Sequence, residues 1–136
     1  MKTETSGLHI LRALLLVYGA ATLAHFIHNA EFLPEYPGLP ATWTRAGVYG
    51  AWLGMTAIGI SGWLLTSRGY RFAGLALVAL YAACGLDSLG HYVLAPMSHH
   101  TVAMNGTILL EVTAAALVFL EATRLAVTRI ARRARS

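Results

Sequence analysis

Histidines and carboxylates recur in stretches of this sequence that are otherwise apolar, and they are the side chains best suited to do chemistry. An ionisable group inside an apolar helix is costly, so it usually faces other polar groups or a water-filled cavity. Neutral imidazole nitrogens are good metal ligands, and carboxylates hold or pass protons. These ionisable side chains are His25, His28, Asp87, His91, His100 and Glu111.

The spacing of these groups places them on one face of each of three helices. His25, His28 and Asn29 follow one another at i, i+3 and i+4, which is one side of a helix. Asp87 and His91 are four residues apart. The last stripe, at i, i+4, i+7 and i+11, consists of His100, Met104, Thr107 and Glu111. Three helices are therefore expected to present one polar stripe each.

A set of imidazoles and carboxylates inside a helical bundle is a recurrent way to bind zinc or a transition metal. The candidate metal ligands are His25, His28, His91 and His100. Asp87 and Glu111 would be further ligands or would orient the rings, and in an enzyme they would be the catalytic groups that handle protons. Met97 and Met104 would favour copper over zinc or iron. The sequence has no HExxH and no paired cysteines, so no fixed motif identifies the metal.

Other interpretations of the same groups stay open. They could relay protons or ions, or shape a ligand cavity, in a carrier or an accessory subunit. They could also form interhelical hydrogen-bonded pairs in a purely structural membrane protein. A bis-histidine haem fits less well, because the second apolar span has no histidine and the carboxylates would have no role. The sequence is compatible with an enzyme, a carrier and a structural protein alike.

Length and composition indicate which elements position these groups. The chain has 136 residues, of which 57% are hydrophobic and 12% are charged, about half the usual share of charge. A soluble domain of this size needs more polar surface. Apolar stretches of about twenty residues, long enough to cross a bilayer as helices, recur instead. We therefore predict an all-α integral membrane four-helix bundle, and the single cysteine excludes an internal disulfide.

A single membrane domain is expected to cover the whole chain, as four spans followed by a basic tail. Pro96 ends the third span, because the residue before a proline avoids helical geometry. Ser98 is the expected N-cap of the fourth span. The spans are about 8–32, 44–66, 71–95 and 98–124, and the tail is 125–136.

The basic residues predict the orientation of the bundle. With four spans, the N-terminal segment, the turn that contains Arg68 and Arg71, and the arginine-rich tail share one side, and only Arg45 lies on the other. The positive-inside rule makes the first side cytoplasmic, so both termini are expected inside a bacterial-type inner membrane. The net charge of +4 then reflects this orientation and contact with membrane lipids, and no nucleic-acid partner is expected.

Helix geometry places the polar groups at similar depths. With a rise of roughly 1.5 Å per residue, His25 lies about 20 Å above Arg12, and Asp87 about 24 Å above Arg71. Glu111 lies at about the same height as His25. These positions share the outer half of a hydrocarbon core of about 30 Å. We therefore expect one shared pocket near the outer face, accessible to a small or lipid-soluble substrate.

The first outer loop, residues 33–40, has a proline at every third position. Such a segment resists regular structure and favours a stiff, extended path. It follows the first polar stripe almost directly. The loop is therefore either an ordinary rigid connector or a lid over the polar cluster.

The second span is rich in glycine and contains a GxxxG motif formed by Gly50 and Gly54. Small residues at this spacing allow two helices to approach closely. We expect these glycines to serve packing, either within the bundle or between copies in a homo-oligomer.

Overall fold

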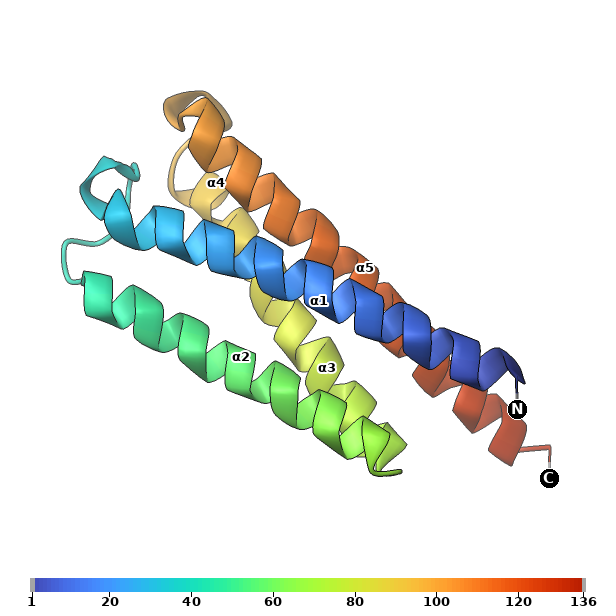
Figure 1. Cartoon of the computed structure of the whole chain (residues 1–136). Helices are drawn as coiled ribbons and strands as arrows, with labels where there is room; N and C mark the ends of the chain where they lie inside the picture. The colour runs from blue at the N-terminus through green and yellow to red at the C-terminus, as the bar shows by residue number, and fades with distance from the viewer. Residues whose placement is uncertain (1, 136) are drawn as a thin grey trace.

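The structure is a computed structural model that describes residues 2–135, with side chains described from Ser6 to Arg135. It confirms the predicted all-α architecture, a bundle of four long helical segments (Figure 1). The α-helices are α1 (Lys2–Glu31), α2 (Arg45–Ser67), α3 (Arg71–Leu86), α4 (Gly90–Leu94) and α5 (Val102–Arg133). Short 3₁₀ turns join them: η1 (Leu33–Glu35), η2 (Asp87–Leu89) and η3 (Met97–His99).

The helices run alternately up and down. Both chain termini and the turn between α2 and α3 lie at one end, which we call the terminal end (Figure 1). The α1–α2 loop and the α4–α5 connection lie at the opposite end, called the loop end. α5 packs against both α1 and α3, and α2 packs mainly against α3, whereas α1 and α2 contact each other less. This leaves α2 on the outside of the bundle.

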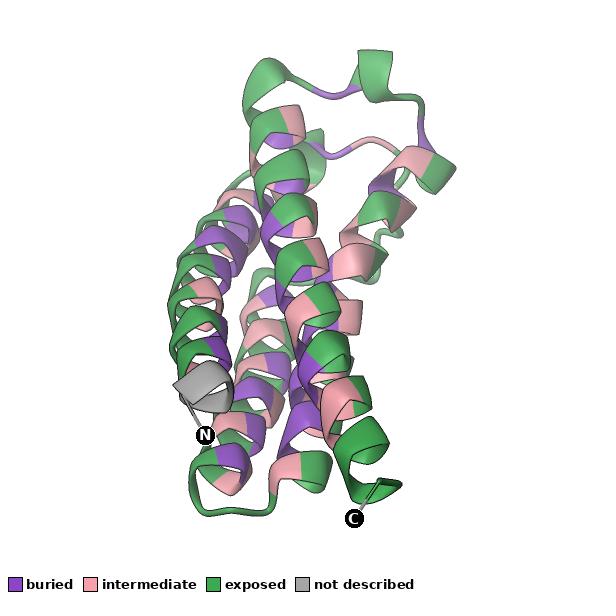
Figure 2. Cartoon of the chain, turned by 90° about the vertical axis from the view of Figure 1, so that its right-hand side faces the viewer, coloured by how far each residue is buried: buried purple, intermediate pink, exposed green. Residues whose placement is uncertain are grey.

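Each of the four segments is long and apolar enough to cross a membrane. They are Ser6–Glu31, Arg45–Ser67, Arg71–Leu94 and Val102–Arg133. Large apolar side chains such as Leu16, Leu53 and Leu120 are exposed on the outside of the bundle, and buried residues line its inner faces (Figure 2). An apolar exterior of this kind is what a bilayer solvates.

The third segment is not one uninterrupted helix over residues 71–95. α3 ends at Leu86, the backbone tightens into the 3₁₀ turn η2, and α4 continues to Leu94. Ala95 is extended, with φ −152° and ψ 148°, as expected before Pro96. The 3₁₀ turn falls in the predicted polar stripe and interrupts the helix between Asp87 and His91.

The fourth segment begins later than predicted, and Ser98 is not its N-cap. Residues 97–99 form η3, in which the amide of His99 donates to the carbonyl of Pro96 at 2.9 Å. The N-cap is Thr101, whose hydroxyl accepts a hydrogen bond from the amide of Met104 at 3.2 Å. A proline-led turn therefore precedes the helix, and α5 continues through most of the basic tail to Arg133.

The glycines of α2 divide into two groups with different surroundings. A Cβ atom at Gly62 would lie 2.8 Å from the backbone nitrogen of Val78, so the absence of a side chain allows α2 and α3 to touch. A Cβ atom at Gly50 or Gly54 would meet nothing within 4 Å. The GxxxG motif therefore does not pack within the bundle, contrary to one of its two expected roles, because it lies on the outer face of α2.

The contact between α2 and α3 predicts different effects for two single-methyl substitutions. A Cβ atom at Gly74 would collide with the backbone nitrogen of Thr66 and lie 2.7 Å from the carbonyl oxygen of Gly62. Gly74→Ala should therefore lower the free energy of unfolding by about 1–3 kcal/mol, the usual cost of overpacking. Gly50→Ala is the matched control and should leave stability unchanged or slightly higher. Thermal unfolding in detergent measures both, and equal effects would contradict this packing.

Candidate functional site

The most deeply buried ionisable pair in the described part of the chain is formed by His25 of α1 and Glu111 of α5. Their exposed fractions are 1% and 0%. Nε2 of His25 lies 3.7 Å from Oε2 of Glu111. The same carboxylate oxygen accepts a hydrogen bond of 2.7 Å from the hydroxyl of Ser88, in η2. Three segments of the bundle therefore meet at Glu111, as the polar stripes predict.

The hydrogen bonds around His25 determine where its protons lie. The hydroxyl of Thr107 donates to the carbonyl oxygen of Met104 at 3.1 Å, so it accepts from Nδ1 of His25 at 3.3 Å. Nδ1 therefore carries a proton, and Nε2 faces the carboxyl of Glu111. The pair is electrically neutral only when it holds one further proton, on Nε2 or on the carboxyl. Neutrality matters because an uncompensated charge here would be very costly.

His91 of α4 lies next to His25, with ring centroids 5.4 Å apart. The side-chain amide nitrogen of Asn29 lies 3.3 Å from Nε2 of His91. An amide nitrogen can only donate, so Nε2 accepts and Nδ1 carries the ring proton. Nδ1 is buried and has no hydrogen-bond partner among the described residues. His91 thus presents an unused donor inside the cluster.

His100 lies at the edge of the same cluster, in the connection that precedes α5. Its ring centroid is 6.2 Å from that of His91. Nδ1 of His100 donates to the carbonyl oxygen of Pro96 at 3.1 Å, which leaves a lone pair on Nε2. That atom is buried and also lacks a partner within the described chain.

Tyr36, in the first outer loop, covers the cluster and was not among the candidate site residues. Its ring is 3% exposed and lies 5.1 Å from the ring of His91. Its hydroxyl hydrogen-bonds Nδ1 of His28 at 2.8 Å, and burial raises the pKa of Tyr36 to about 12. The loop therefore caps the cluster with an aromatic ring. The position of Tyr36 directly after the first polar stripe was the available sequence signal.

The other candidate residues lie outside this cluster. His28 is half-buried, bonded to Tyr36, and packed against the ring of Phe32 at 4.7 Å. Asp87 is exposed and makes no hydrogen bond or ion pair with any described residue. Between residues 6 and 135, no group of three His, Cys, Asp or Glu side chains is arranged so that it could hold a metal ion. The structure therefore gathers His25, His91, His100 and Glu111 without forming a ready metal centre.

Glu31, at the end of the first stripe, is engaged at the rim of the loop end. Its carboxylate lies 2.6 Å from Nη2 of Arg45 and accepts a 2.8 Å hydrogen bond from the hydroxyl of Tyr49. These contacts join the ends of α1 and α2 across the loop. Glu31 thus stabilises the loop end and takes no part in the buried cluster.

A cavity of about 430 Å³ lies beside the His25–Glu111 pair, between α1, α2 and the α3–α4 segment. Its walls include the apolar side chains of Phe26, Leu39 and Trp43. Its polar lining consists of His25, Asn29, Asp87, Ser88 and His91. The cavity thus joins an apolar wall to a hydrogen-bonding wall, an arrangement typical of small-molecule sites.

Comparison of this chain with protein families, characterised proteins and solved structures found no match.

The geometry predicts that His25 and Glu111 depend on each other energetically. Glu111→Leu or His25→Leu alone leaves a buried polar partner without its counterpart, whereas the double replacement removes both. A double-mutant cycle of unfolding free energies in detergent should give a coupling of about 1–3 kcal/mol. The control cycle of His28 with Glu111 should be additive. Additivity in the His25–Glu111 cycle would show that the two groups do not interact.

Proposed function

We propose that this protein is a multi-pass membrane protein that binds a small cationic amphiphile in the cavity at the loop end and exchanges a proton with it. The position of the His25–Glu111 pair is the main support for this function. His25 lines the cavity, and Glu111 lies directly behind it. A buried neutral pair that holds one labile proton can release that proton when another positive charge replaces it.

The lining of the cavity supports a cationic ligand with an apolar body. Among the described residues that line the cavity there is no lysine or arginine, whereas Asp87 contributes a carboxylate that forms no hydrogen bond or ion pair with them. The aromatic rings of Phe26 and Trp43 offer faces on which a cation is favoured. The volume is in the range of sites that enclose small molecules. Asn29 and His91 provide further hydrogen-bonding groups on the polar wall.

Proton exchange follows from charge balance. In the free protein, one further proton, on Nε2 of His25 or on the Glu111 carboxyl, keeps the buried pair neutral. When a cation enters beside the His25 ring, its charge balances the carboxylate instead, and this proton leaves to solvent. Cation binding and proton binding therefore compete, so the affinity for the cation rises with pH.

The orientation and location of the protein are part of this proposal. The terminal end carries almost all of the arginines, including Arg68, Arg71 and the arginine-rich end of α5. By the positive-inside rule this end is cytoplasmic, so the cavity opens toward the outer side of a bacterial-type inner membrane. A ligand could enter from the outer leaflet or from the aqueous phase beneath the Tyr36 cap.

Octyltrimethylammonium is a suitable probe, with octanol as the uncharged control. Calorimetric titration of the protein in nanodiscs, with empty nanodiscs as the baseline, should show that the cation binds with release of about one proton. Octanol should release no proton. Glu111→Gln should abolish proton release. Asp87→Asn should weaken binding about tenfold, or about 1.4 kcal/mol. Cation binding that is independent of pH, or no binding above the empty-disc baseline, would refute the proposal.

Metal binding is a second candidate function, favoured by the positions of the His25 and His100 side chains. The distance of 3.7 Å between Nε2 of His25 and Oε2 of Glu111 is near the roughly 3.4 Å that separates two ligands bonded at about 2 Å to one tetrahedral ion. The bond from His100 to the Pro96 carbonyl is of the kind that orients metal-bound histidines. His91 and His100 would have to move toward His25 to complete such a site.

Metal quantitation separates the two candidates. After incubation with zinc, copper or iron and removal of the free ion, a metalloprotein would retain close to one equivalent per chain. A His25→Ala, His91→Ala double variant would then lose it, with His28→Ala as the control. Under the proposed ligand function, the wild-type protein and both variants retain no stoichiometric metal.

A further inference from the structure

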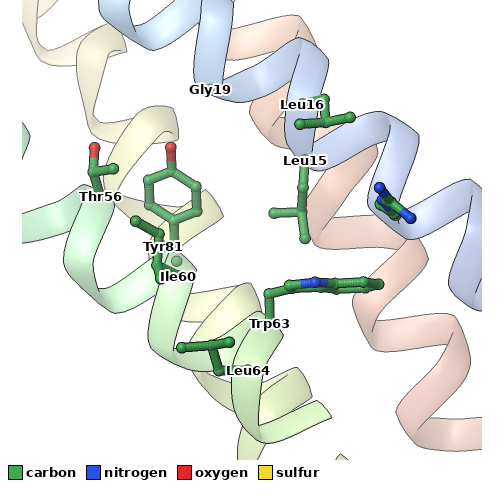
Figure 3. A pocket seen from close by; sticks show the side chains of 10 residues that line it. Leu15, Leu16, Gly19, Thr56, Ile60, Trp63, Leu64 and Tyr81 are labelled. Atoms are coloured by element: carbon green, nitrogen blue, oxygen red, sulfur yellow. The ribbon is translucent and has the colours of Figure 1, made fainter. Parts of the chain in front are cut away.

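We propose that a groove between α1 and α2, near the terminal end, binds an anionic phospholipid whose phosphate pairs with Arg12. The groove is distinct from the histidine cluster and has a volume of about 250 Å³. Figure 3 shows its apolar walls, formed by Leu15 and Leu16 on α1 and by Ile60, Trp63 and Leu64 on α2. This groove exists because α1 and α2 contact each other less than the other neighbouring helices do.

Among the described residues that line the groove, Arg12 is the only charged one. Its side chain is exposed, and it forms no hydrogen bond or ion pair with any described residue. Glu121, an acidic side chain near Gly7 at the same end of the bundle, is already bonded to Arg124. The guanidinium of Arg12 is therefore available to an anion from outside the protein.

The depth of Arg12 indicates that this anion belongs to a lipid. Arg12 lies six residues into the apolar segment that begins at Ser6, about 9 Å along the helix. On the opposite wall, Trp63 lies about 7–8 Å inside Arg68 by the same rise. A guanidinium just below the headgroup level, beside an interfacial tryptophan, reaches outward and is favoured by a negatively charged headgroup.

The shape of the groove suits one hydrocarbon chain of such a lipid. Gly19 and Gly59 line it without contributing side chains, and a Cβ atom at Gly19 would meet nothing within 4 Å. The open space therefore continues inward from Arg12 along α1. At the inner end, the hydroxyls of Thr56 and Tyr81 lie close together (Figure 3). A lipid with its phosphate at Arg12 would place an acyl chain between the leucines and Ile60.

Two variants test separately the charge of Arg12 and the open space of the groove. Arg12→Gln removes the cation and leaves the groove open. Gly19→Leu fills the groove and keeps the cation, and it introduces no backbone clash because the position is open. Arg68→Gln is the matched control, since it removes one arginine from the same end of the bundle without changing the groove.

Native mass spectrometry of the full chain in detergent is the test, with phosphatidylglycerol and phosphatidylcholine of identical acyl chains as probes. The wild-type protein should retain phosphatidylglycerol about fivefold more than phosphatidylcholine, the effect expected of one basic residue at an anionic surface. Arg12→Gln should abolish this preference. Gly19→Leu should reduce the retention of both lipids at least threefold, and Arg68→Gln should behave like the wild-type protein.

Several outcomes would overturn the proposal. An unchanged preference in Arg12→Gln, or unchanged retention in Gly19→Leu, would show that the lipid binds elsewhere. An equal loss in Arg68→Gln would indicate general attraction to basic residues. If Gly19→Leu instead converted a dimer to a monomer in the same spectra, the groove would be an interface between two copies of the chain.

Discussion

A charge buried inside an apolar bundle must be neutralised, and this requirement shapes the structure around Glu111. Glu111 is completely buried at the meeting point of α1, α5 and the α3–α4 segment. A carboxylate at this position is tolerated only if a proton or a cation balances it, because neither lipid nor apolar side chains can solvate it. His25 provides the partner, and Ser88 and Thr107 orient the two groups.

The surrounding elements follow from this requirement. Ser88 lies in the 3₁₀ turn η2, and its hydroxyl donates a hydrogen bond to Glu111. The proline-rich loop places Tyr36 over the histidines and so limits the access of water from the loop end. The ion pair between Glu31 and Arg45 joins the ends of α1 and α2 on either side of this loop. The cluster is therefore covered by Tyr36 at the loop end, and on one side it borders the cavity.

The parts of the site that helix periodicity controls were predictable from the sequence. His25, Asn29 and Glu111 face inward because residues three and four apart share one helical face, and the helical rise gives their common depth. Tyr36 was not predictable as a site residue, because the path of an irregular loop is not encoded by periodicity. His28 hydrogen-bonds Tyr36, so its position in the site also depends on the path of the loop. Asp87 was placed with His91 by their i, i+4 spacing, but the 3₁₀ turn η2 interrupts the helix between them, and Asp87 instead lines the cavity as an exposed residue.

The predicted fold was confirmed at the level of helix number and apolar character, while local details depended on contacts between helices. Glycine content alone could not distinguish Gly62, where α2 touches α3, from Gly50, which faces outward. Proline marked the end of the third segment correctly, but the cap of α5 was assigned to Ser98 instead of Thr101. Several residues near a proline have capping side chains, and only the turn geometry selects between them.

If the buried His25–Glu111 pair holds one labile proton, nitrogen-15 NMR of His25 in the bilayer, recorded with and without octyltrimethylammonium, will detect it. We expect a protonated Nδ1 throughout, and a change in the Nε2 signal when the cation binds and the pair releases its further proton. A His25 ring protonated at Nε2 alone, with a signal that the cation leaves unchanged, would show that the pair does not exchange a proton with the ligand.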